Sequence, residues 1–235
     1  LIYSELVTNP LLRKENLSEL VSLAKKYNLS TMIDNTFATP YLCQPYTYGV
    51  DLVVHSATKY LGGHSDVTAG VLVGRDDLID KAKTRVVNLG SNLGPFEAWL
   101  ACRGLKTLSV RMERHVNNAQ KLADALVKNS GVAKVYYPTS LSSKGNGAIV
   151  SIDITGLCDI ELFFKSLAWV KIVPTLAGVE TSVSYPIATS HRNLTHEKQQ
   201  ELGITEGLIR VSVGIEDADD IIAAFEQAIA NSSQI

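Results

Sequence analysis

Short apolar, β-branched segments alternate with a helical pattern in the first half of the chain, and this alternation constrains the fold most. Residues 31–33, 51–55 and 69–74 are typical of buried strands, and residues 15–28 carry apolar side chains at helical spacing. Strands that alternate with helices through short connections favour a parallel sheet with crossover helices. Ligands of such sheets bind beyond the carboxyl ends of the strands. We therefore expect a ligand site where the first two strands end.

The second half of the chain has a different pattern. Residues 96–129 contain no proline and mostly good helix formers, so we expect one long helix or a broken pair there. Further strand patterns lie at residues 132–137, 147–154, 171–174 and 209–213, and helix patterns lie at residues 159–167 and 217–230. This order is typical of an α+β layer whose sheet is covered on one face.

These patterns predict an α/β chain of two domains. Residues 1–110 would form the C-terminal half of a large domain with a mostly parallel sheet. Residues 111–235 would form a smaller C-terminal α+β domain. The chain begins with Leu1 in what resembles a buried strand, so we expect that an N-terminal segment is missing.

Composition argues against several classes of partner. The formal net charge of −2 disfavours nucleic acid and anionic membranes, which attract basic surfaces. No apolar run approaches the roughly 20 residues that span a bilayer, and no signal peptide opens the chain. The three cysteines, Cys43, Cys102 and Cys158, are too few and too widely spaced for a disulfide framework or a zinc site. We expect reduced, buried thiols in a cytoplasmic protein.

Four side chains near the expected strand ends suggest pyridoxal phosphate (PLP) chemistry. The aldehyde of PLP would form a Schiff base with Lys59, and hydroxyl donors such as Ser56 and Thr58 suit its phosphate. A carboxylate such as Asp34 would keep the pyridine nitrogen protonated. Each residue also has a structural interpretation: a lone lysine is usually a surface residue, and Asp34 could be an N-cap or Asx-turn residue.

Longer motifs add a family resemblance. The motifs, in chain order, are TNP (8–10), DNTFATPYL (34–42), VVHSATKYLGGH (53–64), GLKTL (104–108), RMERH (111–115) and GLIRVSVGIED (207–217). In these segments the chain closely resembles the Cys/Met-metabolism PLP enzymes. That family includes cystathionine γ-synthase, the cystathionine lyases and methionine γ-lyase.

The resemblance implies the fold, the assembly and the roles of individual residues. The fold would be that of the aspartate aminotransferase group, fold type I, in a homotetramer built as a dimer of dimers. Lys59 would hold PLP and carry protons, Asp34 would pair with the pyridinium, and Ser56 and Thr58 would bind the phosphate. Arg210 would bind the α-carboxylate of a small amino-acid substrate. Asn9 would lie near the ring hydroxyl or the same carboxylate.

One departure from the family pattern and one further resemblance bear on substrate choice. The family segment S-L-G-G appears as Thr-Leu-Ala-Gly at residues 175–178, and the added methyl group of Thr175 would tighten the carboxylate pocket. Residues 178–181 resemble the G-x-E-S of cystathionine γ-synthases and γ-lyases, which places Glu180 near the distal end of the substrate. We therefore favour elimination or replacement at Cγ, or at Cβ, of a cystathionine-like substrate.

Several alternatives remain open at this point. The chain could act as a methionine γ-lyase, as a Schiff-base aldolase without PLP, or as a non-catalytic fragment or remnant. The family's N-terminal segment, which supplies a tyrosine over the PLP ring, does not occur in this sequence. His55 and His64 fit no metal-ligand spacing, so we expect no metal and take them as a packed histidine and a turn residue.

Overall fold

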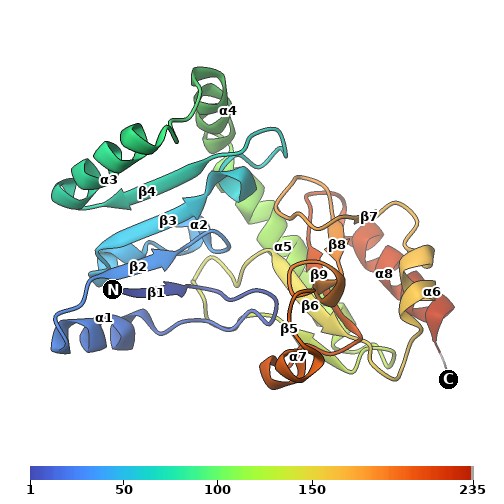
Figure 1. Ribbon diagram of the computed structural model, residues 1–235. Helices are drawn as coiled ribbons and strands as arrows, with labels where there is room; N and C mark the ends of the chain where they lie inside the picture. Colours follow the sequence, from blue (N-terminus) through green and yellow to red (C-terminus); the bar gives the residue numbers. More distant parts are fainter. Residues whose placement is uncertain (234–235) are drawn as a thin grey trace. The chain divides into compact units, whose positions relative to one another are not determined.

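The computed structural model describes residues 1–233 and divides into two compact units (Figure 1). Unit 1 comprises Leu1–Thr8 and Lys14–Val110. Unit 2 comprises Asn9–Arg13 and the chain from Arg111 onward. Each unit has its own sheet.

The sheet of unit 1 is mixed. Its strands, in spatial order, are β1 (Ile2–Glu5), β2 (Thr31–Asp34), β3 (Leu52–Ser56) and β4 (Gly70–Gly74). The first three are mutually parallel, as the alternating pattern predicts, but β4 runs antiparallel to β3. The connection from β3 to β4 contains one short helical turn, η2 (Ala57–Leu61), and no crossover helix. A parallel return normally requires such a helix, so β4 enters the sheet in the opposite direction.

The helical segments of unit 1 are mostly short. They are α1 (Leu17–Lys26), α2 (Thr39–Leu42), η1 (Pro45–Tyr48), η2, α3 (Asp76–Leu89), α4 (Pro95–Leu105) and the first residues of α5 (Leu108–Leu126). Helix α1 begins where Asn16 accepts a hydrogen bond from the Glu19 amide, and it buries four apolar residues against the unit. Helix α3, which the sequence analysis missed, lies along β4 and contains no buried residue (Figure 1).

The long helical segment is a broken pair. Helix α4 ends at Leu105 and α5 begins at Leu108, and the Thr107 hydroxyl donates to the Gly104 carbonyl at 3.1 Å. Gly104 is buried, and a Cβ at this position would collide with the backbone of Gly62, the residue that follows η2. The missing side chain therefore lets α4 approach the turn that carries Lys59.

The sheet of unit 2 is largely antiparallel. Its strands, in spatial order, are β5 (Lys134–Tyr136), β6 (Ile149–Asp153), β9 (Leu208–Ser212), β8 (Ser182–Ser184) and β7 (Lys171–Ile172). Among the described strands of this second sheet, only β7 and β8 pair in parallel. The remaining segments are α6 (Ile160–Ser166), η3 (Pro186–Ala188), α7 (His196–Leu202) and α8 (Ala218–Ser232). The sequence patterns predicted β5, β6, β7, β9, α6 and α8, and they missed β8 and α7.

Both faces of this sheet are buried. Helices α5, α6 and α8 share one apolar core with Val150, Ile152, Ile209 and Val211 of the central strands. The opposite face carries Ser151, Arg210 and Ser184 in one row across β6, β9 and β8, and all three are also buried. The expectation of a sheet covered on one face is therefore wrong, because irregular chain segments cover the second face.

The cysteines differ in exposure. Cys158 is buried, Cys43 is half-buried and Cys102 lies on the exposed side of α4, so the expectation of buried thiols is wrong for Cys102. All three are unpaired. Within residues 1–233, no helix combines the length and the apolar character that crossing a membrane requires.

Candidate active site

Four predicted site residues gather at one edge of the sheet in unit 1. Asp34 is the last residue of β2, Ser56 is the last residue of β3, and Thr58 and Lys59 follow in η2. Because β2 and β3 are adjacent and parallel, their carboxyl ends meet at this edge. All four side chains are half-buried.

The turn that carries Lys59 is held from two sides. The Ser56 amide donates to the Thr36 hydroxyl at 2.8 Å, which ties the end of β3 to the loop after β2. Lys59 departs from helical geometry, with φ −90° and ψ −134°, and its carbonyl accepts from the Gly63 amide at 2.7 Å. The amine is thus carried on a short, irregular and hydrogen-bonded turn.

The two oxygens of Asp34 have different donors. Oδ1 accepts from the Thr36 amide at 2.9 Å, which is the Asx-turn contact considered as the structural alternative. Oδ2 accepts from the Tyr3 hydroxyl at 3.4 Å. Neither Tyr3 nor Thr36 was predicted as a partner of Asp34. Tyr3 lies two residues before Glu5 in β1, so the alternation of side chains along a strand places both on the same face.

The hydroxyls of Thr58 and Ser56, both near Lys59, differ in their hydrogen bonds. Thr58 Oγ1 accepts from the Ala69 amide at 3.1 Å and donates to the Ala69 carbonyl at 3.4 Å. Ser56 Oγ makes no hydrogen bond to any described residue. An amine, two hydroxyls and a carboxylate are the groups that the aldehyde, the phosphate and the ring nitrogen of PLP require. The residues present therefore fit this cofactor.

The two histidines of this region behave as packing and turn residues, as predicted. His55 is buried in β3, and burial lowers the pKa of its imidazole. His64 follows the Gly62-Gly63 turn, and its Nδ1 lies 2.8 Å from the Gly62 carbonyl.

In unit 2, Arg210 is the most tightly held of the predicted site residues. It lies in the middle of β9 and is 3% exposed. Its Nη1 donates to Asn9 Oδ1 at 3.2 Å, and its Nη2 donates to the carbonyls of Pro174 and Thr175, each at 3.1 Å. These three hydrogen bonds fix the plane of the guanidinium before any substrate is present.

The other residues of unit 2 have different surroundings from those expected. Thr175 contacts Arg210 through its backbone carbonyl, and the residue itself is exposed. Glu180 is exposed and accepts from Lys171 Nζ at 2.8 Å. Lys171 was not predicted as a partner of Glu180, because nothing in the local pattern indicates that β7 brings it there. His191 was not predicted either; its pKa is lowered by burial and by the charge of Arg210.

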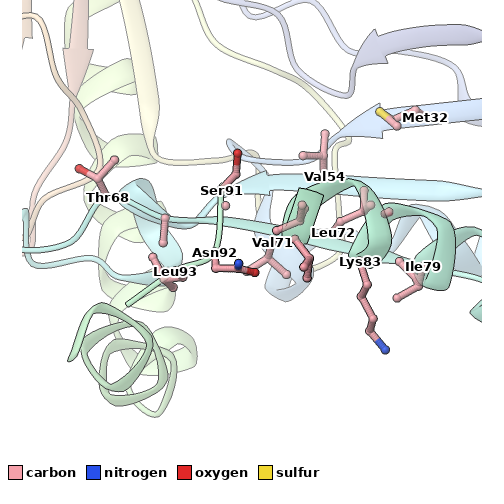
Figure 2. Close-up of a pocket in the computed structure, with 15 residues that line it drawn as sticks. Met32, Val54, Thr68, Val71, Leu72, Ile79, Lys83, Ser91, Asn92 and Leu93 are labelled. Carbon is pink, nitrogen blue, oxygen red and sulfur yellow. The ribbon is translucent and has the colours of Figure 1, made fainter. Parts of the chain in front are cut away.

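A separate hollow of about 910 Å³ lies in unit 1 on the face of the sheet that α3 follows (Figure 2). Met32, Val54 and Leu72 line it from the sheet, and Ile79 and Lys83 line it from α3. Asp34 is paired with Val54 and so points to the same face. None of the predicted site residues is among those that line the hollow. Its lining is mainly apolar, unlike the polar cluster at the strand ends.

Comparison with known proteins identifies the family. The family model described as Cys/Met metabolism PLP-dependent enzyme matches residues 1–230. A cystathionine beta-lyase of Lactococcus lactis subsp. cremoris is 40% identical over 97% of this chain and 63% of that protein. A cystathionine gamma-lyase of Bacillus subtilis (strain 168) is 42% identical over 98% of this chain and 64% of that protein. The chain thus spans a little under two thirds of the curated relatives it matches.

A solved structure agrees with this match in fold. The crystal structure of cystathionine gamma-lyase from Lactobacillus plantarum, complexed with L-serine, matches with a TM-score of 0.92 and 36% sequence identity. The match covers 98% of this chain and 64% of that one. Family model, relatives and fold agree along almost the whole sequence, and the chain belongs to the Cys/Met metabolism PLP-dependent enzymes.

Proposed function

We propose that this chain is the larger part of a PLP-dependent lyase or transferase that eliminates or replaces a group at Cγ, or at Cβ, of a cystathionine-like amino acid. The observation that carries this proposal is the grouping of Lys59, Asp34, Ser56 and Thr58 at the ends of two adjacent parallel strands. Each side chain matches one chemical group of PLP. Family membership supports the same cofactor.

Unit 1 would bind the cofactor and move the substrate proton. Bound PLP would supply an aldehyde that captures amino groups and a ring that accepts electrons. Lys59 would hold the aldehyde carbon and would accept and return the α-proton of the amino acid at Nζ. Asp34 would keep the ring nitrogen protonated. Ser56 and Thr58 would donate to the phosphate, and Thr58 would give up its long 3.4 Å contact to Ala69 to do so.

Unit 2 would bind the substrate carboxylate. Arg210 is already oriented by Asn9 and by the carbonyls of Pro174 and Thr175. A carboxylate that meets a buried guanidinium forms charge-assisted hydrogen bonds that are stronger than those on an open surface. The methyl group of Thr175 would narrow the space beside them.

The ion pair of Glu180 with Lys171 favours a second candidate, a methionine γ-lyase activity. A distal ammonium such as that of cystathionine would have to compete with Lys171 for Glu180. A substrate without a distal charge, such as methionine, has no such competition. The relatives named β-lyase and γ-lyase are 40% and 42% identical to the chain, so identity does not choose between reactions.

We further propose the architecture and setting that the family implies. Unit 1 would be part of the large domain of fold type I, with a boundary near residue 110, and unit 2 would be the small C-terminal domain. The complete protein would assemble as a homotetramer, a dimer of dimers. Three unpaired cysteines support a reducing compartment such as the cytoplasm.

The decisive test is the visible absorption spectrum of the purified protein after incubation with PLP. We expect a visible band from lysine-bound PLP that is lost in Lys59→Ala and retained in Lys83→Ala, which removes another lysine of unit 1. A wild-type chain without this band would favour the non-catalytic remnant. Activity on carbonyl substrates without PLP would instead favour the aldolase.

A screen of substrates then tests which amino acid the protein uses. Cystathionine, methionine and homoserine esters would be compared for the wild type and Lys171→Ala. If Glu180 binds a distal ammonium, removing Lys171 raises kcat/KM for cystathionine and leaves that for methionine unchanged.

A further inference from the structure

Tyr3, which donates a hydrogen bond to Asp34 from the neighbouring strand, has no role in the function proposed above. β1 pairs in parallel with β2, with Tyr3 opposite Met32 and Glu5 opposite Asp34. Residues directly opposite in a sheet point to the same face. Tyr3 and Asp34 are therefore diagonal neighbours on one face, a separation that an aromatic side chain can bridge. The hydroxyl of Tyr3 reaches Oδ2 of Asp34 at 3.4 Å.

We propose that Tyr3 is a positioning residue that orients the Asp34 carboxylate toward the ring nitrogen of the cofactor. This inference rests on the proposed function, because it assumes that Asp34 is the pyridinium partner. The Thr36 amide donates to Oδ1 at 2.9 Å, and the Tyr3 hydroxyl donates to Oδ2 at 3.4 Å. Two donors on different oxygens restrict rotation of the carboxylate, which one donor alone does not do.

The charges on this face of the sheet favour a hydrogen-bond donor beside Asp34. Glu5 lies opposite Asp34, so two carboxylate side chains point to the same side of the sheet. Like charges directly opposite each other destabilise a sheet. A neutral hydroxyl that donates to one of them offsets part of this repulsion, and phenylalanine would not.

The phenol remains a donor throughout the neutral range. The side chain is 56% exposed, and partial desolvation of the phenol raises its pKa, as do the negative charges of Asp34 and Glu5 and the hydrogen bond to Asp34. Ionisation would place a third negative charge on this face. Tyr3 therefore keeps its hydroxyl proton at neutral pH and can donate it to Oδ2 of Asp34.

The contact is tested first without PLP. The full chain would carry ¹³Cζ-labelled tyrosine, and the Tyr3 resonance, assigned with Tyr3→Phe, would be followed with pH. We expect Asp34→Asn to lower the pKa of Tyr3, and the Tyr48 resonance to follow the same curve in both proteins. Tyr48 is a suitable control because it is another exposed tyrosine of unit 1 and lies in η1. An unchanged Tyr3 titration would overturn the proposed contact.

The positioning role is tested by a double-mutant cycle on PLP affinity. Tyr3→Phe should raise the dissociation constant of PLP about three- to tenfold, the effect of one hydrogen bond, while Tyr48→Phe should not change it. In an Asp34→Asn background, Tyr3→Phe should have no further effect. An equal effect in both backgrounds would show that Tyr3 acts independently of Asp34 and would sink the proposal.

Failure of the proposed function gives a different result. If the wild-type chain forms no lysine-bound PLP, the assignment of Asp34 as pyridinium partner fails, and with it the cofactor role of Tyr3. The phenol titration would still report whether Tyr3 contacts Asp34.

Discussion

At the scale of single residues, two buried cationic or titratable side chains of unit 2 are held by backbone carbonyls. Arg210 donates to the carbonyls of Pro174 and Thr175, and His115 Nδ1 lies 2.7 Å from the Val213 carbonyl. Buried polar groups are stable only when such partners satisfy them. The two residues differ in consequence, because Arg210 remains charged and His115 does not.

Replacing Arg210 with lysine should separate substrate binding from cofactor binding. A lysine cannot reproduce the planar fork that contacts Asn9 and the two carbonyls. We expect Arg210→Lys to weaken binding of amino-acid substrates about ten- to a hundredfold, the effect of losing a hydrogen bond to a charged group. Substrate titration followed by absorbance would measure it. The exposed Arg192→Lys is the matched control, and equal substrate affinity in both variants would argue against the carboxylate role.

His115 should make the stability of unit 2 depend on pH. Burial, with a smaller contribution from the charge of Arg111, lowers its pKa from 6.5 to about 4. The unfolded chain therefore binds a proton below about pH 6.5 that the folded chain excludes until about pH 4. Stability contributed by neutral His115 is complete above pH 6.5 and is lost as the pH falls, by up to about 3 kcal/mol. His55 and His191, whose pKa values are also lowered, act in the same direction.

The measurement is urea unfolding between pH 8 and pH 5. His115→Gln should flatten the pH dependence of the unfolding free energy, whereas His196→Gln, at an exposed position, should retain the wild-type dependence. A wild-type protein whose stability does not change over this range would contradict the assignment of His115.

At the scale of elements, the packing of α4 on η2 controls the turn that carries Lys59. Gly104 approaches the Gly62 backbone so closely that a Cβ would overlap its carbonyl. Backbone atoms cannot move aside as the end of a flexible side chain can. In the sequence, Gly104 stands out only as the first residue of the GLKTL motif, since local propensity carries no information about its contact with Gly62.

Gly104→Ala should therefore destabilise unit 1 and weaken PLP binding together. We expect a loss of about 1–3 kcal/mol, typical of overpacking, and a lower affinity for PLP because η2 must shift. Thermal unfolding and a PLP titration would measure the two effects. Cys102→Ala, on the exposed side of the same helix, should change neither. Normal PLP affinity in a destabilised Gly104→Ala would show that α4 does not position the turn.

At the scale of the whole molecule, unit 1 exposes a group of large apolar side chains on two successive helices. Val87 and Leu89 of α3 and Phe96 and Trp99 of α4 are each more than half exposed, and the rings of Phe96 and Trp99 stack with centroids 6.0 Å apart. Exposed apolar side chains that pack on one another, as Phe96 and Trp99 do, commonly mark interfaces. This pair fits the homotetramer that we propose.

Sedimentation of the wild type and of the Phe96→Ala, Trp99→Ala double variant would test this assignment. We expect the double variant to sediment as a smaller species than the wild type at the same concentration. Trp169→Ala, at an exposed tryptophan of unit 2, is the control and should sediment as the wild type. Identical masses for all three proteins would remove α4 from the interface.

The sequence by itself determined the local features of this protein. Short apolar, β-branched runs placed β2 and β3, and the polar residues that follow them placed Asp34 and Lys59 at adjacent strand ends. Motif resemblance placed the chain in its family. Such features depend on neighbouring residues, so a local pattern is enough to predict them.

Only the tertiary structure decided the partners. Tyr3 meets Asp34 across 31 residues, and Asn9 meets Arg210 across 201 residues. The tertiary structure alone also decided the antiparallel direction of β4 and the burial of the second face of the sheet in unit 2. Strand order and register bring these residues together, and no pattern within one segment encodes the register of another.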